Sequence, residues 1–290
     1  MSHLAELSRA FEALAANVAN RTVCVHDGSR GASGFLWSEG QIVTAEETLA
    51  GEGEDQVQVT LPDGRMVSAE VAGRDPSTDV ALLRAETGAV EPWTHATPSI
   101  GALALVVGRQ ASGPLAAFGM VGLAGTAWTS MAGGRIDARI GLSFGLGHQL
   151  EGGAAVAADC GLIGLAVADP RRRALVIPAA TVARSVAVLH EKGHVSRGFL
   201  GLRLQPLRGG NGGLVVAEIS EGGPGAAAGL LVGDIITTWD AEPLRSMRGI
   251  SARLGPDSVG RVLRLGVVRG GSTIEVEVTV GDRTQERQRS

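Results

Sequence analysis

The stretch of residues 55–75, "DQVQVTLPDGRMVSAEVAGRD", constrains the fold of this chain more than any other part of the sequence. Apolar and polar residues alternate on both sides of a Pro-Asp-Gly turn. Such alternation is typical of strands with one buried face and one face in water, and a turn of this kind joins two strands into an antiparallel hairpin. We therefore predict a hairpin here with one solvated face.

Short apolar runs separated by glycines extend the strand pattern along most of the chain. The 290 residues include 43 glycines, well above the usual share of about 7%. Glycines between short apolar runs indicate tight turns between short strands. Apolar residues make up 44% of the chain, which is enough for a sizeable core. The sequence thus predicts a mostly β protein.

Two helical patterns help to divide the chain into domains. Apolar residues spaced three and four apart predict an amphipathic helix within residues 1–21, which either packs on its own domain or joins subunits. The stripe consists of Leu4, Leu7, Phe11, Leu14 and Val18. A second helix is expected to begin after Pro178 and to end near Gly193. The predicted domains are an N-terminal helix at 1–21, a barrel domain at 22–195, a compact α+β domain at 196–282 and a polar, disordered tail at 283–290.

Charge and hydropathy exclude several classes of partner. The formal net charge is −4 and the pI about 5.9, so nucleic acid is not an expected partner. No window approaches the roughly 18 consecutive apolar residues of a membrane span, so no membrane is expected either. Cys24 and Cys160 lack the neighbours of a metal site or a redox pair, and we expect no metal and no cofactor.

The N-terminal sequence bears on location. It reads "MSHLAELSRAFEALAANVAN", with acidic residues early and no basic segment followed by an apolar one. This pattern does not resemble a secretory signal. We therefore expect a cytoplasmic protein, with the periplasm as the alternative for a trimmed N-terminus.

Four motifs, in chain order, carry a resemblance to a known family. They are "GASGFLWSEGQIVTA", "LPDGRMVSAEVAGRDPSTDVALLR", "RGFLGLRL" and "AAAGLLVGDIITTWD". Together they resemble the HtrA-type serine proteases across nearly the whole chain. The resemblance implies a trypsin-like double β-barrel followed by an α+β PDZ domain, hence a mostly β fold.

The resemblance also assigns the three positions of a catalytic triad. Such a triad needs a hydroxyl that attacks the carbonyl, an imidazole that takes its proton and a carboxylate that holds the imidazole. Asp79, in "STDVALL", matches the carboxylate. The histidine position, after Thr-Ala-Glu, holds Glu47, and the serine position, before a Gly-Gly pair, holds Glu151.

Two glutamates in place of the imidazole and the hydroxyl predict the loss of catalysis. A carboxylate cannot replace the serine hydroxyl, and Glu151 would place a negative charge where the oxyanion forms. We therefore expect no enzyme activity and a pseudoprotease. The alternative is a serine endopeptidase or chaperone of the HtrA type with a rebuilt active site. For that alternative, Ser143 and His148, expected in one loop, are the nearest hydroxyl and imidazole.

Three acids at the former triad positions raise a question of charge. If Glu47, Asp79 and Glu151 converge, they must share protons, pair with an arginine or bind a divalent ion. Because exposed acids are the rule, we expect Glu47 and Glu151 to turn out to solvent instead. The arginine run at residues 171–173 is expected to be a solvated turn, or a basic lip that attracts acidic peptides.

The C-terminal domain carries a clear binding signal. A PDZ domain adds a C-terminal peptide as a strand, and backbone N–H groups of one loop capture the peptide carboxylate. The opposite wall of the groove is expected to be a helix at residues 247–254, with Ile250 and Leu254 facing the peptide. The resemblance places the carboxylate loop at four residues, Phe199, Leu200, Gly201 and Leu202.

Together these features predict an inactive, HtrA-like scaffold or regulator that binds peptides or protein C-termini through its PDZ domain. Because the family often forms trimers through its N-terminal segment, the apolar stripe within residues 1–21 suggests a homotrimer or a mixed oligomer with an active paralogue.

Overall fold

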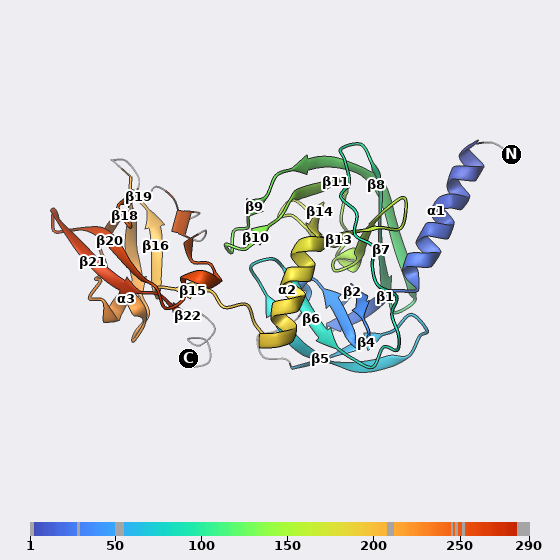
Figure 1. Cartoon of the computed structure of the whole chain (residues 1–290), viewed down its shortest axis with the longest axis horizontal. Coiled ribbons are helices and arrows are strands. Elements are labelled where there is room, and N and C mark those ends of the chain that lie inside the picture. Colours follow the sequence, from blue (N-terminus) through green and yellow to red (C-terminus); the bar gives the residue numbers. More distant parts are fainter. Residues whose placement is uncertain are drawn as a thin grey trace. The chain divides into compact units, whose positions relative to one another are not determined.

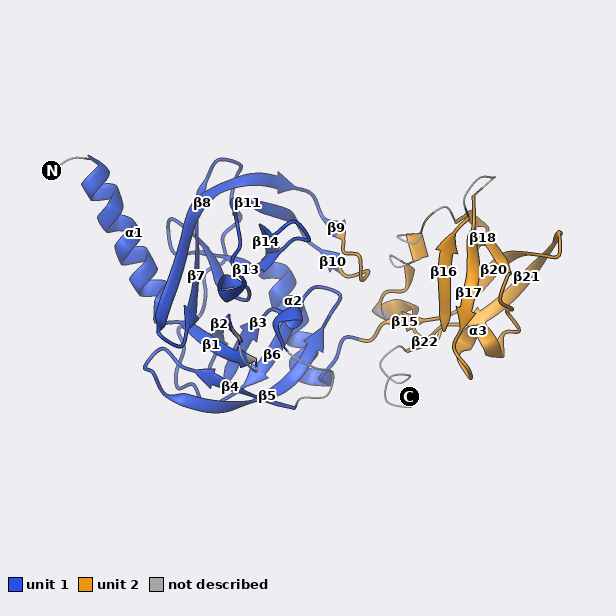
Figure 2. Ribbon diagram, turned by 180° about the vertical axis from the view of Figure 1, so that it is seen from behind, with its two compact units in different colours: residues 1–128, 135–195 blue, residues 129–134, 196–290 orange. Residues whose placement is uncertain are grey.

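The computed structural model describes residues 3–27, 30–49, 55–207, 212–244, 246, 249–250 and 253–282. The chain divides into two compact units (Figures 1 and 2). Unit 1 comprises residues 1–128 and 135–195, and unit 2 comprises residues 129–134 and 196–290. None of the helices in the described ranges is long and apolar enough to span a bilayer.

The predicted hairpin is present in unit 1, as part of a closed barrel. Alternate residues of its first strand, including Val57 and Val59, are buried, as expected for a strand with one wet face. Gln56 lies opposite Glu70, so the two strands pair as a continuous antiparallel ladder. The strands of this barrel are, in spatial order, β1 (Thr22–Asp27), β2 (Arg30–Ser38), β3 (Gln41–Thr44), β6 (Val80–Arg84), β5 (Met66–Asp75) and β4 (Gln56–Thr60).

A second closed barrel completes the double-barrel fold of unit 1. Its strands are, in spatial order, β11 (Arg139–Gly145), β14 (Arg173–Pro178), β13 (Leu162–Ala168), β12 (Ala154–Ala157), β7 (Leu103–Gln110) and β8 (Gly113–Gly125). Two short strands, β9 (Trp128–Thr129) and β10 (Arg135–Ile136), pair beside it. The trypsin-like architecture expected from the resemblance is therefore confirmed.

An apolar core joins the two barrels into one body. Phe35 of β2 and Val107 of β7 belong to the same buried cluster, which also includes Leu189 of helix α2 (Ala179–Lys192). The helix begins after Pro178 as predicted. Full burial of each such side chain contributes about 1.5–3 kcal/mol. The shared core therefore holds both barrels and the helix together.

The N-terminal helix α1 (His3–Ala19) packs on unit 1 through only part of its apolar stripe. Leu14 and Val18, near its end, are buried. Leu4 and Leu7, near its start, remain 76% and 46% exposed. Figure 1 shows the start of the helix projecting away from the barrels. Only the C-terminal part of the apolar stripe is therefore buried within the chain.

Unit 2 is the expected α+β domain. Leu214, Trp239 and Leu265 belong to its core. Its main sheet runs β16 (Leu202–Pro206), β17 (Leu214–Ile219), β18 (Ile235–Trp239), β20 (Val262–Arg269) and β21 (Ser272–Thr279), with β19 (Glu242–Pro243) paired to β18. The smaller elements are β15 (Gly198–Phe199), β22 (Gly281–Asp282), helix α3 (Pro224–Ala227) and the 3-10 turn η3 (Pro256–Ser258). The tail predicted at 283–290 lies outside the described residues.

Candidate functional site

The structure brings together the three acids that the resemblance assigns to the triad positions. Glu47 lies in the 3-10 turn η1 (Glu46–Thr48), and Asp79 lies in the turn before β6. Glu151 comes from the second barrel, directly after the 3-10 turn η2 (His148–Leu150). The N–H of Glu47 donates to Asp79 Oδ1 at 2.8 Å, and the charges of both glutamates act on Asp79. The three carboxylates therefore converge where the barrels meet.

Asp79 is mostly protonated at neutral pH. Burial of its carboxyl raises its pKa to about 8, with the charges of Glu47, Glu46 and Glu151 adding to the rise and the hydrogen bond from Glu47 opposing it. In a working triad the corresponding carboxylate is ionised, because its charge stabilises the imidazolium. A neutral Asp79 beside further acids does not supply that charge.

The two glutamates differ in exposure. Glu47 is exposed, as expected. The expectation that Glu151 turns out to solvent is wrong, because its side chain is only 12% exposed. A carboxylate stays inside a protein when charged or polar partners replace its water, and Glu151 has such partners.

Arg172 and His148 each bind one oxygen of the Glu151 carboxylate. Arg172 Nη1 forms an ion pair with Oε1, and His148 Nδ1 lies 2.7 Å from Oε2. Arg172 Nη2 also donates to the Leu146 carbonyl at 2.9 Å, and the Leu146 N–H donates to the Arg172 carbonyl at 2.9 Å. The ion pair between Glu151 and Arg172 thus links the turn at residues 169–173 to the turn at residues 148–151.

Sequence reasoning missed the role of Arg172. Arg171 is exposed, and Arg173 pairs with Asp169. Arg172 instead turns toward Glu151 from a left-handed backbone conformation, with φ 60°. Arg172 is still 53% exposed, so the turn is solvated as predicted, but the sequence carries no signal that this arginine of the three pairs with Glu151.

The backbone at the nucleophile position is also engaged. Oxyanion stabilisation needs N–H groups aimed at open space beside the reacting carbonyl. The N–H of Glu151 instead donates to the His148 carbonyl at 3.1 Å, and that of Leu150 donates to Gly147 at 2.9 Å. The 3-10 turn η2 therefore uses the Glu151 donor within the loop.

The Gly-Gly pair after Glu151 has a packing reason that is independent of catalysis. Gly152 has φ +84°, and a Cβ there would lie 2.0 Å from the Ser33 carbonyl oxygen. A Cβ at Gly153 would lie 2.7 Å from a backbone oxygen of β7. Ser33 also donates its hydroxyl to the Gln149 carbonyl at 2.5 Å and its N–H to the Glu151 carbonyl at 2.9 Å. The pair lets the loop pack directly on both barrels.

The two residues of a rebuilt active site are not in one loop, contrary to expectation. Ser143 lies within β11, where its hydroxyl accepts the Met120 N–H at 3.0 Å. His148 lies in η2 and binds Glu151. Among the described residues, no hydrogen bond joins the two side chains.

The expected carboxylate loop of unit 2 has unused backbone donors. Gly201 adopts φ +68°, and Leu200 is buried. The carbonyls of Leu200 and Gly201 accept the N–H groups of Gly225 at 2.7 Å and Ser220 at 2.8 Å. Within the described ranges, the N–H groups of Leu200 and Gly201 donate to no protein acceptor. Two adjacent free donors in a turn can bind an anion.

Apolar side chains and a strand edge border this loop. Phe199 and Leu202 are half-buried, and β16 is an edge strand. Ile250 is buried in the core of unit 2, and Leu254 packs half-buried against it. Residues 247–248 and 251–252 of the expected helix lie outside the described residues. The peptide-facing role of Ile250 and Leu254 stays a prediction.

Comparison with known families identifies the class. The trypsin-like peptidase domain family matches residues 32–218, and the PDZ domain family matches residues 198–280. The chain therefore belongs to the trypsin-like peptidase family and carries a PDZ domain. Within that class the chain is similar in sequence to DegP-like serine endoproteases and in fold to an HtrA-type protease.

Two curated relatives illustrate the similarity. The probable periplasmic serine endoprotease DegP-like of Bartonella henselae is 28% identical over 273 residues, which cover 86% of this chain and 52% of the relative. The periplasmic pH-dependent serine endoprotease DegQ of Escherichia coli is 27% identical over 267 residues, covering 85% and 58%. The chain thus spans about half the length of the curated relatives it matches.

Solved structures share the fold. The HtrA-type protease AlgW with a decapeptide superposes with a TM-score of 0.72 at 22% identity, over 94% of this chain and 98% of that one. The serine endoprotease from Yersinia pestis gives 0.72 at 23%, over 94% and 97%.

The expected cytoplasmic location is wrong. The curated relatives are named periplasmic enzymes, and they point to the periplasm instead.

Proposed function

We propose that the trypsin-like unit of this chain is catalytically inactive and that the chain acts as a scaffold or regulator that binds peptides or protein C-termini. One observation carries the proposal. The residue at the nucleophile position, Glu151, is a buried carboxylate held on both oxygens by Arg172 and His148. A carboxylate so engaged supplies no attacking hydroxyl, and its charge opposes an oxyanion.

A second candidate is an endopeptidase with a rebuilt site. The relatives are named serine endoproteases, and Glu151 orients the His148 imidazole as a triad carboxylate would. A nucleophile is what this arrangement lacks, since no serine or threonine hydroxyl among the described residues forms a hydrogen bond with His148. Any activity would therefore depend on a displaced hydroxyl such as that of Ser143.

The test is an assay for proteolysis. The purified chain is incubated with unfolded casein and with a fluorophosphonate probe for activated serines, with E. coli DegQ as positive control. We expect neither cleavage nor labelling. Cleavage that disappears in a Glu47→Ala, Glu151→Ala double variant would overturn the proposal and make the acids catalytic. Labelling lost in Ser143→Ala would establish the second candidate.

Peptide capture is supported by the free N–H groups of Leu200 and Gly201 beside the edge of β16. A peptide that pairs with this edge would place its terminal carboxylate on those two donors. The AlgW structures hold a decapeptide or a tripeptide, which is consistent with this role for the domain. Fluorescence anisotropy with a library of C-terminal peptides tests it. Equal affinity for free-acid and amidated peptides would contradict carboxylate capture.

We also propose that the chain assembles through α1, in the periplasm of its cell. Leu4 and Leu7 expose an apolar stripe that a second copy, or a paralogue, would cover. Light scattering coupled to size exclusion should show an oligomer that a Leu4→Asp, Leu7→Asp variant dissociates. A wild-type monomer at about 100 μM would contradict assembly, because stable interfaces persist well below that concentration.

A further inference from the structure

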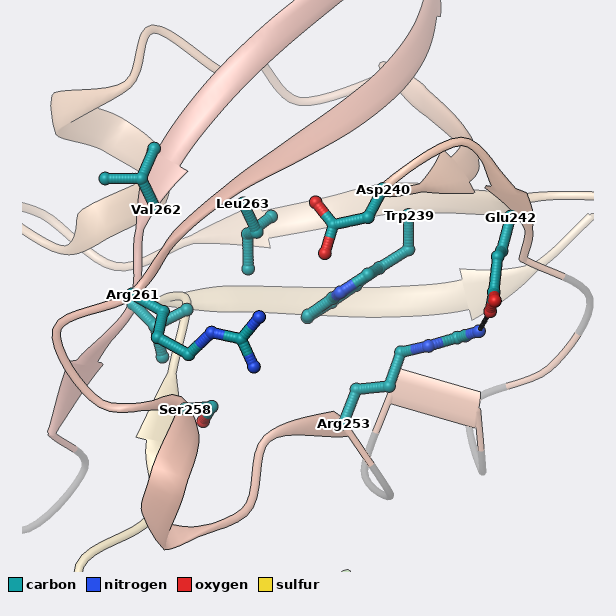
Figure 3. Close-up of a pocket in the computed structure, with 9 residues that line it drawn as sticks. Trp239, Asp240, Glu242, Arg253, Ser258, Arg261, Val262 and Leu263 are labelled. Atoms are coloured by element: carbon teal, nitrogen blue, oxygen red, sulfur yellow. Dashed lines mark hydrogen bonds and ion pairs between the residues drawn. The ribbon is translucent and has the colours of Figure 1, made fainter.

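Unit 2 contains a pocket that the peptide site does not use. It has a volume of ≈ 290 Å³ and lies between the end of β18, the turn η3 and the start of β20 (Figure 3). None of the four residues of the carboxylate loop lines it. This volume is at the lower limit of about 300–1,000 Å³ for ligand pockets, so only a small molecule fits.

The floor of the pocket is apolar. Trp239, Leu263 and Val280 line it and are at most 5% exposed. Figure 3 shows the Trp239 side chain reaching in among the other lining side chains. An apolar group placed on this floor would lose its contact with water, which favours binding.

Two opposite charges at the pocket lack a partner. The Arg261 guanidinium extends toward the Trp239 ring (Figure 3), and within the described residues no hydrogen bond or ion pair engages it. Asp240 Oδ1 accepts the Arg264 N–H at 2.9 Å, which fixes the carboxylate and leaves Oδ2 without a described partner. Asp240 and Arg261 form no ion pair with each other among the described residues.

The remaining charges at the rim cancel. Arg253 forms an ion pair with Glu242 across the edge of the pocket (Figure 3). The Asp240 side chain is held over the pocket by a turn in which both Asp240 and Ala241 have left-handed conformations, with φ 46° and 67°. These are the usual conformations of a two-residue hairpin turn, and this turn joins β18 to β19.

We propose that this pocket binds a free α-amino acid with an apolar side chain. The carboxylate of the ligand pairs with Arg261, its ammonium group pairs with Asp240 Oδ2, and its side chain lies on Trp239. A zwitterion carries one group of each charge, so it pairs with both Arg261 and Asp240. A simple carboxylate would leave Asp240 unpaired beside an anion, and a simple amine would leave Arg261 unpaired beside a cation. The proposal is independent of peptide binding and of catalysis.

Binding is measured on the full ¹⁵N-labelled chain by following the indole N–H signals of its four tryptophans. A Trp239→Phe variant assigns the relevant signal. L-leucine should shift it saturably with a dissociation constant of about 10 mM or tighter, as expected for so few ligand atoms. N-acetyl-L-leucine and L-leucinamide, which each lack one charge, should bind about tenfold more weakly.

Matched variants locate the site. Arg261→Gln should weaken leucine binding about tenfold, because it removes the carboxylate partner. Arg264→Gln, the same change three residues further along the chain and outside the pocket, should leave binding unaltered. If Arg261→Gln fails to fold, Asp240→Asn replaces it. This variant keeps the acceptor for the Arg264 N–H and removes the charge that pairs with the ammonium group of the ligand. The absence of a saturable shift up to about 50 mM, well above the expected constant, would overturn the proposal. Equal binding of N-acetyl-L-leucine would overturn it as well.

Discussion

The loop that carries Glu151 and the loop that carries Leu200 and Gly201 differ in whether their polar groups have hydrogen-bonding partners within the protein. At Glu151 both carboxylate oxygens and the backbone N–H have partners within the protein. At Leu200 and Gly201 two backbone N–H groups donate to no described protein acceptor. Since unpaired buried donors cost free energy, a loop that keeps them is suited to a ligand, whereas a loop that pairs them is suited to stability.

The largest effect should come from adding a methyl group to the closed loop. Gly152→Ala would place a Cβ 2.0 Å from the Ser33 carbonyl oxygen, at φ +84°. We expect the free energy of unfolding to fall by more than about 4 kcal/mol, or folding to fail. Urea denaturation followed by tryptophan fluorescence measures it. Gly147→Ala, in the same loop, is the control, since a Cβ there meets nothing within 4 Å. Equal stability of the two variants would refute the packing explanation.

The next effect concerns the ion pair that closes the loop. Arg172→Ala leaves the buried Glu151 carboxylate with His148 alone, so we expect the free energy of unfolding to fall by about 2–3 kcal/mol. Arg171→Ala removes an exposed arginine from the same run and should change it by less than about 0.5 kcal/mol. The same urea titration compares them. If both variants behave alike, the anchoring role of Glu151 is wrong.

A smaller effect should appear in the pH dependence. The pKa of Asp79 is raised from 3.8 to about 8, so between these values the folded protein holds a proton that the unfolded chain has released. Stability should therefore fall as pH rises through this window and level off above pH 8. Asp79→Asn removes the titration, and its Tm at pH 8 should exceed that of the wild type by about 3–6 °C.

Calorimetry at pH 4 and pH 8 measures this difference. The two proteins should unfold at similar temperatures at pH 4, where Asp79 is protonated in the folded state. Asp55→Asn, an exposed site in the same unit, is the control and should show no gain at pH 8. A wild-type Tm at pH 8 equal to or above that of Asp79→Asn would contradict the raised pKa.

The smallest effect is expected at the open loop. Gly201→Ala opposes the left-handed conformation, with φ +68°, that presents the two donors. We expect about tenfold weaker binding of a C-terminal peptide, by anisotropy. Gly229→Ala imposes a similar backbone penalty at φ +77°, away from that loop, and should leave peptide affinity unchanged. Parallel losses of affinity would mean that the effect is one of stability alone.

Elements that follow from a periodic pattern or from a motif could be predicted from the sequence. The alternation at residues 55–75 gave the hairpin, and the motifs in chain order led to the double barrel and the PDZ domain. The burial of Glu151 was not predictable, because its partner Arg172 lies 21 residues away and reaches Glu151 from a single left-handed residue. A general rule that acids are exposed holds for Glu47, and it fails where a distant loop supplies a counter-charge.

Ser33 carries a consequence for how such a chain can diverge. Its hydroxyl and N–H reach across from the first barrel to the loop of the second, and its carbonyl leaves no room for a side chain at Gly152. Inheritance of the glycines is thereby tied to folding, while the identity of residue 151 is tied to chemistry. A protein that descends from a protease can exchange its nucleophile for another residue and keep the protease fold. The Gly-Gly pair therefore indicates descent from that fold and does not indicate activity.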